Sequence, residues 1–168
     1  MRGVFPPPQL TETAHAAARR LVERGETLAV CESSAGGLIS ASLLSFPGAS
    51  AFYLGGTVIY TLAGTKAQFD GGSIPFPEKP RSASEGWATY LATAVGDRLG
   101  AGWALAETGA SGPRGNPYGD PAGHTWVACL GPGGVTATRN LLTGSDDRGA
   151  NMVAFAAAAL SLLLEQLA

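Results

Sequence analysis

The chain has 168 residues, of which 45% are hydrophobic and 14% are charged, and its formal net charge is −2. This size and composition are typical of one compact domain with a substantial core, and they exclude a disordered chain. No run of Lys or Arg is present, which argues against nucleic acid as the main partner. Cys31 and Cys129 lie in apolar runs, as reduced core residues of a cytoplasmic protein do.

The N-terminal half alternates predicted helices and strands. Three consecutive prolines predict an extended arm over residues 1–9, so the domain itself is expected over 10–168. Helices are predicted over 10–24, with Thr11 or Thr13 as cap, and over 35–44, with a short one near Lys66. The β-rich segments 27–31 and 56–61 predict strands.

In the C-terminal half, residues 70–81 predict a surface loop because they are rich in Gly and Pro. A helix over 82–99, capped by Ser82 or Ser84, precedes a strand over 103–107. A long loop over 108–123 leads to a hairpin of strands 124–130 and 135–142, and a buried helix covers 148–166. This order predicts a single-domain α/β protein, a three-layer α/β/α sandwich with a mixed, mainly parallel sheet.

No segment predicts a membrane span or an export signal. The most apolar run, residues 152–164, is too short to cross a bilayer. The first residues lack the apolar stretch of a signal peptide, so we expect a cytoplasmic protein without membrane contact.

The segment 28–37, LAVCESSAGG, predicts a buried strand, a turn of small residues and the start of a helix. Such a turn exposes hydroxyls and backbone N–H groups at the carboxyl end of a strand, where a helix N-terminus also favours anions. We therefore expect a reaction or a bound phosphate near Ser33 and Ser34. The alternative is a plain turn in which a serine caps the helix.

A second candidate site segment is the loop 108–123, TGASGPRGNPYGDPAG. Long loops inside compact domains are usually functional. This loop follows a strand that ends at Glu107, and loops at the carboxyl ends of strands line the crevice of an α/β sheet. We expect it to face the turn at 32–37, although a flexible surface excursion is the alternative.

Three motifs together resemble the CinA C-terminal domain family: ESSAGG at 32–37, the strand at Tyr60 followed by Lys66, and GASGPRG at 109–115. The resemblance runs in order from about residue 10 to 164. Family members with an assigned activity are nicotinamide-nucleotide amidases, which hydrolyse nicotinamide mononucleotide to nicotinate mononucleotide and ammonia. The resemblance implies the α/β fold, a small mononucleotide as partner, and a possible homodimer, which the apolar terminal helices also favour.

The resemblance maps the nucleophile to Ser33, with Tyr60 and Lys66 as assisting catalytic residues, Lys66 only across a one-residue insertion. A serine needs a base and an oxyanion site, which Lys66 and the N–H groups around Ser34 and Gly36 are expected to supply. The chain departs from the family pattern where Ser34 replaces Cys and Ala35 replaces Thr. Two further departures are Leu62 in place of Asn and Asp120 in place of Lys.

The expected substrate-binding residues come from both segments. Arginine grips phosphate with two parallel hydrogen bonds, so Arg114 and Arg148 are phosphate candidates, or else solvated surface charges. Glu32 orients Ser33 or a ligand, or is a carboxylate at a helix start, and Asn116 binds ribose or makes a turn. The full predicted set is Glu32, Ser34, Gly36, Gly37, Ser111, Gly112, Arg114, Gly115 and Asn116.

The resemblance thus implies an amidohydrolase. We expect it to be metal-independent and without a cofactor, because the two His and two Cys residues have no metal-ligand spacing. A carboxylate site of Glu32, Glu107 and Asp120 is a less favoured alternative. Two other functions stay open: a nucleotide-binding module that has lost catalysis, motivated by Ala35, Leu62 and Asp120, and an amidase for a different small amide.

Overall fold

The computed structural model describes residues 5–168. Its helices and strands are, in chain order, α1 (Pro8–Arg24), β1 (Leu28–Glu32), α2 (Leu38–Leu44), β2 (Tyr53–Val58), α3 (Leu62–Phe69), α4 (Glu85–Leu99), β3 (Trp103–Ala110), β4 (His124–Gly131), β5 (Val135–Leu142) and α5 (Arg148–Gln166).

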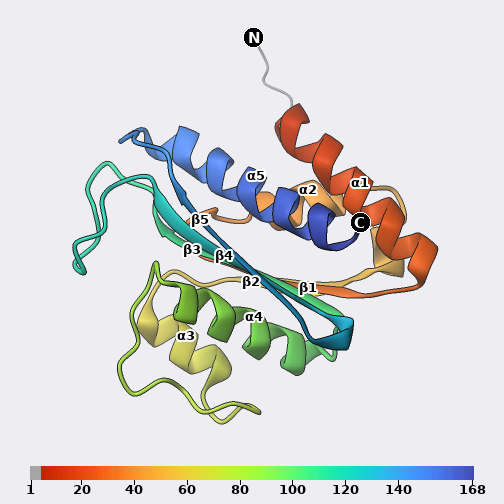
Figure 1. Ribbon diagram of the computed structural model, residues 1–168, viewed down its shortest axis with the longest axis horizontal. Coiled ribbons are helices and arrows are strands. Elements are labelled where there is room, and N and C mark those ends of the chain that lie inside the picture. The colour runs from red at the N-terminus through yellow and green to blue at the C-terminus, as the bar shows by residue number, and fades with distance from the viewer. Residues whose placement is uncertain (1–4) are drawn as a thin grey trace.

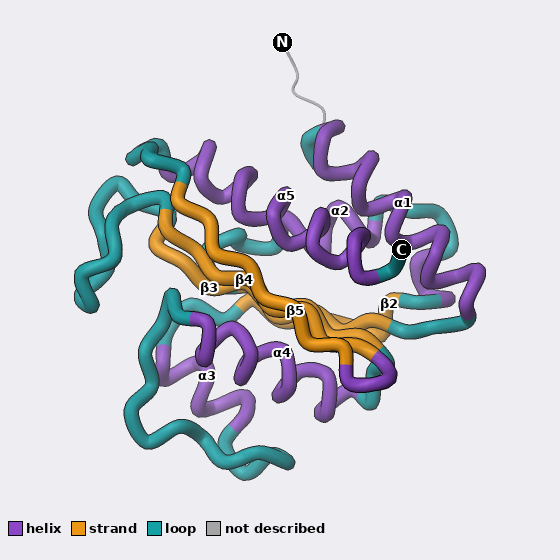
Figure 2. Tube along the Cα trace, in the orientation of Figure 1, coloured by secondary structure: helices purple, strands orange, loops and turns teal. Residues whose placement is uncertain are grey.

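The strands form one five-stranded mixed sheet in the order β2-β1-β3-β4-β5. β1 pairs in parallel with β2 and β3, while β3-β4 and β4-β5 are antiparallel. Helices α1, α2 and α5 cover one face and α3 and α4 the other (Figures 1 and 2). The predicted three-layer α/β/α sandwich with a mixed sheet is confirmed, and the 124–142 hairpin supplies its antiparallel part.

Side chains of β1 and β3 alternate between two apolar layers. Leu28, Val30 and Leu105 pack with α1, α2 and α5, whereas Ala29 and Ala106 pack with α4. All five residues of β1 are buried. A strand covered on both faces reads as a continuous apolar run, which is why the segment before Glu32 shows no polar alternation.

Several element boundaries differ from the predicted ones for local reasons. α1 begins at Pro8 and has no side-chain cap, so residues 8 and 9 of the predicted arm are helical. Proline suits the first helical turn because its missing N–H needs no partner there. Thr11 instead donates its hydroxyl proton to the Pro8 carbonyl over 2.9 Å. Residues 1–4 of the arm lie outside the described residues.

The predicted start of α2 and the predicted span of β2 were also wrong. α2 begins at Leu38 because Gly36 and Gly37 hold φ values of +67° and +97°, which keep residues 33–37 in a turn. β2 ends at Val58, before Tyr60, because Thr61 caps α3 and accepts a hydrogen bond from the Gly64 N–H at 3.0 Å. Both changes leave predicted site residues just beyond a strand end.

α5 is the one helix among residues 5–168 that is long and apolar enough to cross a membrane. Its Phe155, Leu160 and Leu163 are fully buried, and the helix packs against the sheet and beside α1 (Figure 1). α5 is therefore the buried C-terminal core helix that the sequence predicts.

Candidate active site

Two hollows meet at Ser33, just beyond the carboxyl end of β1. The larger, which we call the cleft, has a volume of about 450 Å³ and is lined by Ser33, Tyr60, Ser82, residues 109–117 and Arg148. The smaller, the side pocket, measures about 100 Å³ and has Ile59, Leu62, Trp87 and Leu91 among its lining residues. Ser33, Tyr60 and Ser82 line both hollows. The loop 111–123 and the start of α5 lie at this end of the molecule (Figure 1).

Glu32 lies beneath the turn and is fully buried. Its carboxylate accepts hydrogen bonds from the backbone N–H groups of Gly37, Ile39 and Ser40 at 2.9, 3.0 and 2.8 Å, and from the Ser40 hydroxyl at 2.6 Å. These are the donors that a helix N-terminus leaves without intrahelical partners. The geometry supports the interpretation of Glu32 as a helix-start carboxylate and leaves the α2 N-terminus occupied by the chain itself.

Glu107, on the neighbouring strand β3, holds the other half of the turn. Its carboxylate accepts from the N–H groups of Ser33 at 3.1 Å and Ala35 at 2.8 Å, and from the hydroxyls of Ser34 and, at 3.1 Å, Thr125. Burial raises the pKa of Glu107, and these hydrogen bonds partly oppose that shift. A fully buried carboxylate thus ties the Ser33 turn to the middle strand of the sheet.

Most backbone N–H groups of the turn already donate hydrogen bonds within the chain, so fewer of them than expected can stabilise an oxyanion. The Gly36 N–H donates to the Ser33 carbonyl at 3.1 Å, while the N–H groups of Ser33 and Ala35 donate to Glu107. Within the described chain, Ser34 is the residue of 33–36 whose N–H has no acceptor. Of the two N–H donors expected to stabilise the oxyanion, Ser34 remains available and Gly36 does not.

The Ser33 hydroxyl makes no hydrogen bond to residues 5–168, and Ser33 is half-buried where it lines the two hollows. Behind Ser33, the close packing of β3 against the turn depends on Gly109. A Cβ at Gly109 would lie 2.7 Å from the His124 carbonyl oxygen and 2.8 Å from the Ser34 hydroxyl. Gly109 therefore lets β3 and the turn pack closely enough to present Ser33 to the cleft.

Tyr60 and Arg148 meet across the cleft from sequence positions 88 residues apart. The Arg148 guanidinium donates to the Tyr60 hydroxyl and to the Gly112 carbonyl, both at 2.7 Å, and lies over the Tyr60 ring at 5.7 Å. Because the Tyr60 oxygen accepts this bond, its own proton is free to point toward a ligand. Arg148, one of the two phosphate candidates, is thereby fixed at the wall of the cleft.

Lys66 lies on α3 and lines neither hollow. Its side chain is 64% exposed, and its ammonium group lies 3.8 Å from the Asp70 carboxylate. The structure therefore brings Ser33 and Tyr60 together at the cleft and does not bring Lys66 with them.

The loop 111–123 contributes the opposite wall of the cleft, where Ser111, Gly112, Arg114, Gly115 and Asn116 all line it. Arg114 is exposed, and Ser111 is buried with its backbone carbonyl accepting from Asn151 at 2.8 Å. Asn151, on α5, also donates to the Ser145 carbonyl at 2.9 Å. The expectation that this loop faces the 32–37 turn is correct, because both line one cleft.

Asp120 forms an ion pair with Arg81, and the two oxygens of its carboxylate lie 2.9 and 3.0 Å from the same guanidinium nitrogen. Asn116 donates to the same carboxylate at 2.8 Å. Burial raises the pKa of Asp120, but the hydrogen bonds of Asn116 and Arg81 outweigh it and leave that pKa below its usual value. Arg81, in the loop 70–84, thus neutralises the negative charge of Asp120, the residue that stands where the family pattern has a Lys.

The sequence reasoning missed several residues of the site. Ser82, one of the two predicted caps, and Trp87, a buried core residue, both line the side pocket. Thr125 and Asn151 hold Glu107 and Ser111 from distant elements. No local pattern marks any of these positions, because each acquires its role from packing between segments that are far apart in sequence.

Among residues 5–168, no group of three or more His, Cys, Asp or Glu side chains is placed to hold a metal ion. The carboxylates of Glu32 and Glu107 are instead committed to backbone donors.

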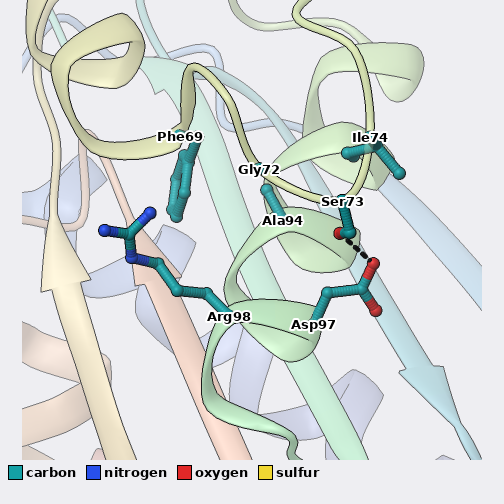
Figure 3. Close-up of a pocket in the computed structure, with 7 residues that line it drawn as sticks. All are labelled: Phe69, Gly72, Ser73, Ile74, Ala94, Asp97 and Arg98. Carbon is teal, nitrogen blue, oxygen red and sulfur yellow. Dashed lines mark hydrogen bonds between the residues drawn. The ribbon is translucent and has the colours of Figure 1, made fainter.

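A third hollow, of about 100 Å³, lies apart from the site, between α3, α4 and the loop after α3 (Figure 3). Phe69 and Ile74 form apolar walls, and the Ser73 hydroxyl donates to the Asp97 carboxylate at 2.6 Å. This bond attaches the loop to α4, and none of the predicted site residues lines the hollow.

Fold and site together define a three-layer α/β protein with a serine turn beside an arginine-bearing cleft. A family model described as "CinA C-terminal domain" matches residues 10–167. The chain therefore belongs to the CinA C-terminal domain family.

Similar proteins agree with this assignment. A CinA-like protein of a Synechocystis species is 36% identical over 142 residues, 84% of this chain and 34% of that protein. One from an Anaeromyxobacter species is 38% identical over 138 residues, 82% of this chain and 33% of that protein. The chain thus spans about a third of the length of these curated relatives.

Solved structures share the whole fold. The competence/damage inducible protein CihA from Agrobacterium tumefaciens is 25% identical, with a TM-score of 0.86 over 96% of this chain and 98% of that chain. A competence-damaged protein (CinA) superfamily protein from Klebsiella pneumoniae is 27% identical, with a TM-score of 0.84 over 94% and 97%. The predicted family resemblance is therefore confirmed.

Proposed function

We propose that this chain is a metal-independent amidohydrolase of the nicotinamide-nucleotide amidase type, which converts nicotinamide mononucleotide and water to nicotinate mononucleotide and ammonia. The observation that carries the proposal is the position of Ser33, where a small side pocket with aromatic and aliphatic residues in its lining meets a larger cleft that bears Arg114 and Arg148. A flat pyridine ring suits the side pocket beside Trp87 and Leu91, which places its carboxamide at Ser33. The ribose and phosphate then extend into the cleft.

Arg148 and Arg114 are the proposed phosphate-binding residues. Guanidinium groups present paired N–H donors that match phosphate oxygens. Arg148 is already oriented by Tyr60 and by the Gly112 carbonyl, so little side-chain freedom is lost when a ligand binds. The Ser111, Gly115 and Asn116 positions of the cleft are available to the ribose.

In the proposed reaction, the Ser33 hydroxyl oxygen attacks the carboxamide carbon and the carbonyl oxygen becomes an oxyanion facing the Ser34 N–H. Tyr60 relays the proton: its oxygen accepts the Ser33 proton while its own proton passes to the nitrogen. The C–N bond then breaks and ammonia leaves. Water attacks the acyl-serine, releases nicotinate mononucleotide and restores the Ser33 hydroxyl.

The role of Lys66 as the base stays a prediction. A lysine acts as a base when burial or a nearby cation lowers its pKa, whereas Lys66 is exposed beside the Asp70 carboxylate. Tyr60 is the group that this geometry favours for proton transfer. A comparison of Lys66→Ala with Tyr60→Phe separates the two roles.

The test is ammonia release from nicotinamide mononucleotide by the native chain, by Ser33→Ala and by Ser50→Ala, an exposed serine that precedes the amino end of β2 and lines neither hollow. We expect Ser33→Ala to lower kcat at least about 10³-fold and Ser50→Ala to leave it unchanged, because only Ser33 forms the acyl intermediate. Equal activity of Ser33→Ala and the native chain would falsify the proposal.

Two other outcomes point to the alternatives. Binding of the mononucleotide without ammonia release identifies a nucleotide-binding module that has lost catalysis. The observation that favours this alternative is Asp120, which is paired with Arg81 and stands where the family pattern has a Lys. Release of ammonia from another amide alone identifies a different substrate.

We also propose a cytoplasmic location, because the buried thiols of Cys31 and Cys129 are both free.

A further inference from the structure

We infer that Glu107 is a positioning residue for the nucleophile: it fixes the backbone of the Ser33 turn from the middle strand of the sheet. The inference rests on the proposed function for the identity of Ser33 as nucleophile. It assigns Glu107 a role that differs from the carboxylate site considered from the sequence, because Glu107 holds the chain and not a ligand.

The hydrogen bonds divide by carboxylate oxygen. Glu107 Oε2 accepts from the N–H groups of Ser33 and Ala35, which flank the turn's second serine. Glu107 Oε1 accepts from the Ser34 and Thr125 hydroxyls. Three of the four donors belong to the turn, so displacement of this carboxylate displaces Ser33 relative to the cleft.

Glu107 does not touch the reacting atoms. It is fully buried and lines neither the cleft nor the side pocket. Proton transfer to substrate requires direct reach, or reach through one water, and the hydroxyls bonded to Glu107 belong to the buried Ser34 and Thr125 and not to Ser33. Its effect on the reaction therefore passes through the position of the backbone.

A glutamine at this position keeps the geometry and removes the charge. Its carbonyl oxygen can accept from the Ser33 and Ala35 N–H groups, while its NH₂ group donates to the Ser34 and Thr125 hydroxyl oxygens. Thr125 keeps a partner for its own proton, because its hydroxyl also lies 3.0 Å from the Thr108 carbonyl. An aspartate does the reverse, since it keeps the charge and withdraws it by one methylene.

The experiment compares Glu107→Gln and Glu107→Asp in ammonia release, with Ser42→Ala, a buried hydroxyl outside both hollows, as the control. We expect Glu107→Gln to keep kcat within about threefold of the native value. Glu107→Asp should lower kcat about 100-fold with little change in KM, because a displacement of about 1 Å at the reacting group has that effect. Ser42→Ala, which removes only a hydroxyl that donates to the Leu38 carbonyl at 2.6 Å, should leave kcat near the native value.

Loss of activity in Glu107→Gln with retention in Glu107→Asp overturns the inference, because charge and not position would then matter. Native activity in both variants overturns it too, as does loss of activity in folded Glu107→Gln whatever Glu107→Asp does. If Glu107→Asp does not fold, the prediction for Glu107→Gln still decides between position and charge.

A second readout does not depend on activity. Amide hydrogen exchange, resolved by residue, should rise at least about tenfold at Ser33 and Ala35 in Glu107→Asp relative to Glu107→Gln, because those N–H groups lose their acceptor. Equal exchange in the two variants contradicts positioning. If the native chain releases no ammonia while this exchange difference is present, the amidase proposal fails and the structural role of Glu107 stands.

Discussion

Two buried glutamates hold the two halves of a single turn. Glu32 accepts from the first amides of α2, and Glu107 accepts from the amides of Ser33 and Ala35. A buried carboxylate is costly unless charge-assisted hydrogen bonds replace its water. Both glutamates meet this requirement with N–H donors of the turn and of the first residues of α2. These hydrogen bonds fix the backbone of the turn that presents Ser33.

At this scale we predict that Glu32→Ala lowers the free energy of unfolding by about 3 kcal/mol. The substitution leaves the N–H groups of Gly37, Ile39 and Ser40 without their acceptor, and each unpaired buried donor costs about 1–3 kcal/mol, partly recovered when water enters. Urea unfolding measures the change, with the exposed Glu23→Ala as control. A change below about 1 kcal/mol contradicts the role of Glu32 as the anchor of α2.

A long-range ion pair joins two of the loops that contribute residues to the cleft. The ion pair of Arg81 and Asp120 joins the loop 70–84 to the loop 111–123, and Arg81 also lies over the Tyr118 ring at 5.6 Å. Because Ser82 directly follows Arg81 and lines both hollows, this ion pair holds one wall of the site in place.

We predict that Arg81→Ala increases amide hydrogen exchange in residues 76–84 while the free energy of unfolding changes by less than about 1 kcal/mol, as is usual for exposed ion pairs. Lys79→Ala, in the same loop and without an ion pair in the described structure, is the control. Unchanged exchange in Arg81→Ala argues against the attachment.

The same ion pair has a defined pH dependence. The pKa of Asp120 in the folded chain lies below its usual value, so the carboxylate stabilises the fold at neutral pH. This contribution is lost as the pH falls through the lowered pKa. The exchange difference between the native chain and Arg81→Ala should accordingly disappear in acid, below the usual pKa range of an aspartate.

In the whole molecule, both cysteines belong to the core. Burial raises the pKa of Cys129 to about 12, and burial together with Glu107 and Glu32 raises that of Cys31. The thiolate is the reactive form. We predict that neither thiol reacts with a disulfide reagent such as dithionitrobenzoate at pH 8 until the chain unfolds, and that both react in urea. Prompt reaction of one thiol in the native chain would show that its strand opens to solvent.

The predicted homodimer stays a prediction, but one argument for it changes. The apolar residues of α1 and α5, such as Leu21 and Leu163, are buried within the domain. The exposed apolar side chains include Val22 on α1 and, on and just after the edge strand β2, Leu54, Val58 and Leu62. Sedimentation velocity at micromolar concentration measures the oligomeric state.

The sequence alone determined the three-layer architecture and the location of the Ser33 turn. Apolar runs at 28–31 and 103–106, the helix-forming segments between them and the Gly-rich breaks are local signals, and local signals determine which segments form strands, helices and turns. The same signals placed a long loop after the second of these runs, opposite the turn, but the predicted bounds 108–123 were wrong, because β3 pairs with β4 as far as Ala110 and the loop covers only residues 111–123.

Only the tertiary structure decided which side chains meet. Glu107 reaches Ser33 across 74 residues and Arg148 reaches Tyr60 across 88, while Lys66, close to Tyr60 in sequence, points to solvent. Strand order, register and helix packing produce these contacts. The periodicity of the sequence cannot predict them, because it describes only neighbouring residues. The sequence therefore predicted the segments that form the site, whereas the fold determined which of their residues line the cleft and which hold it in place.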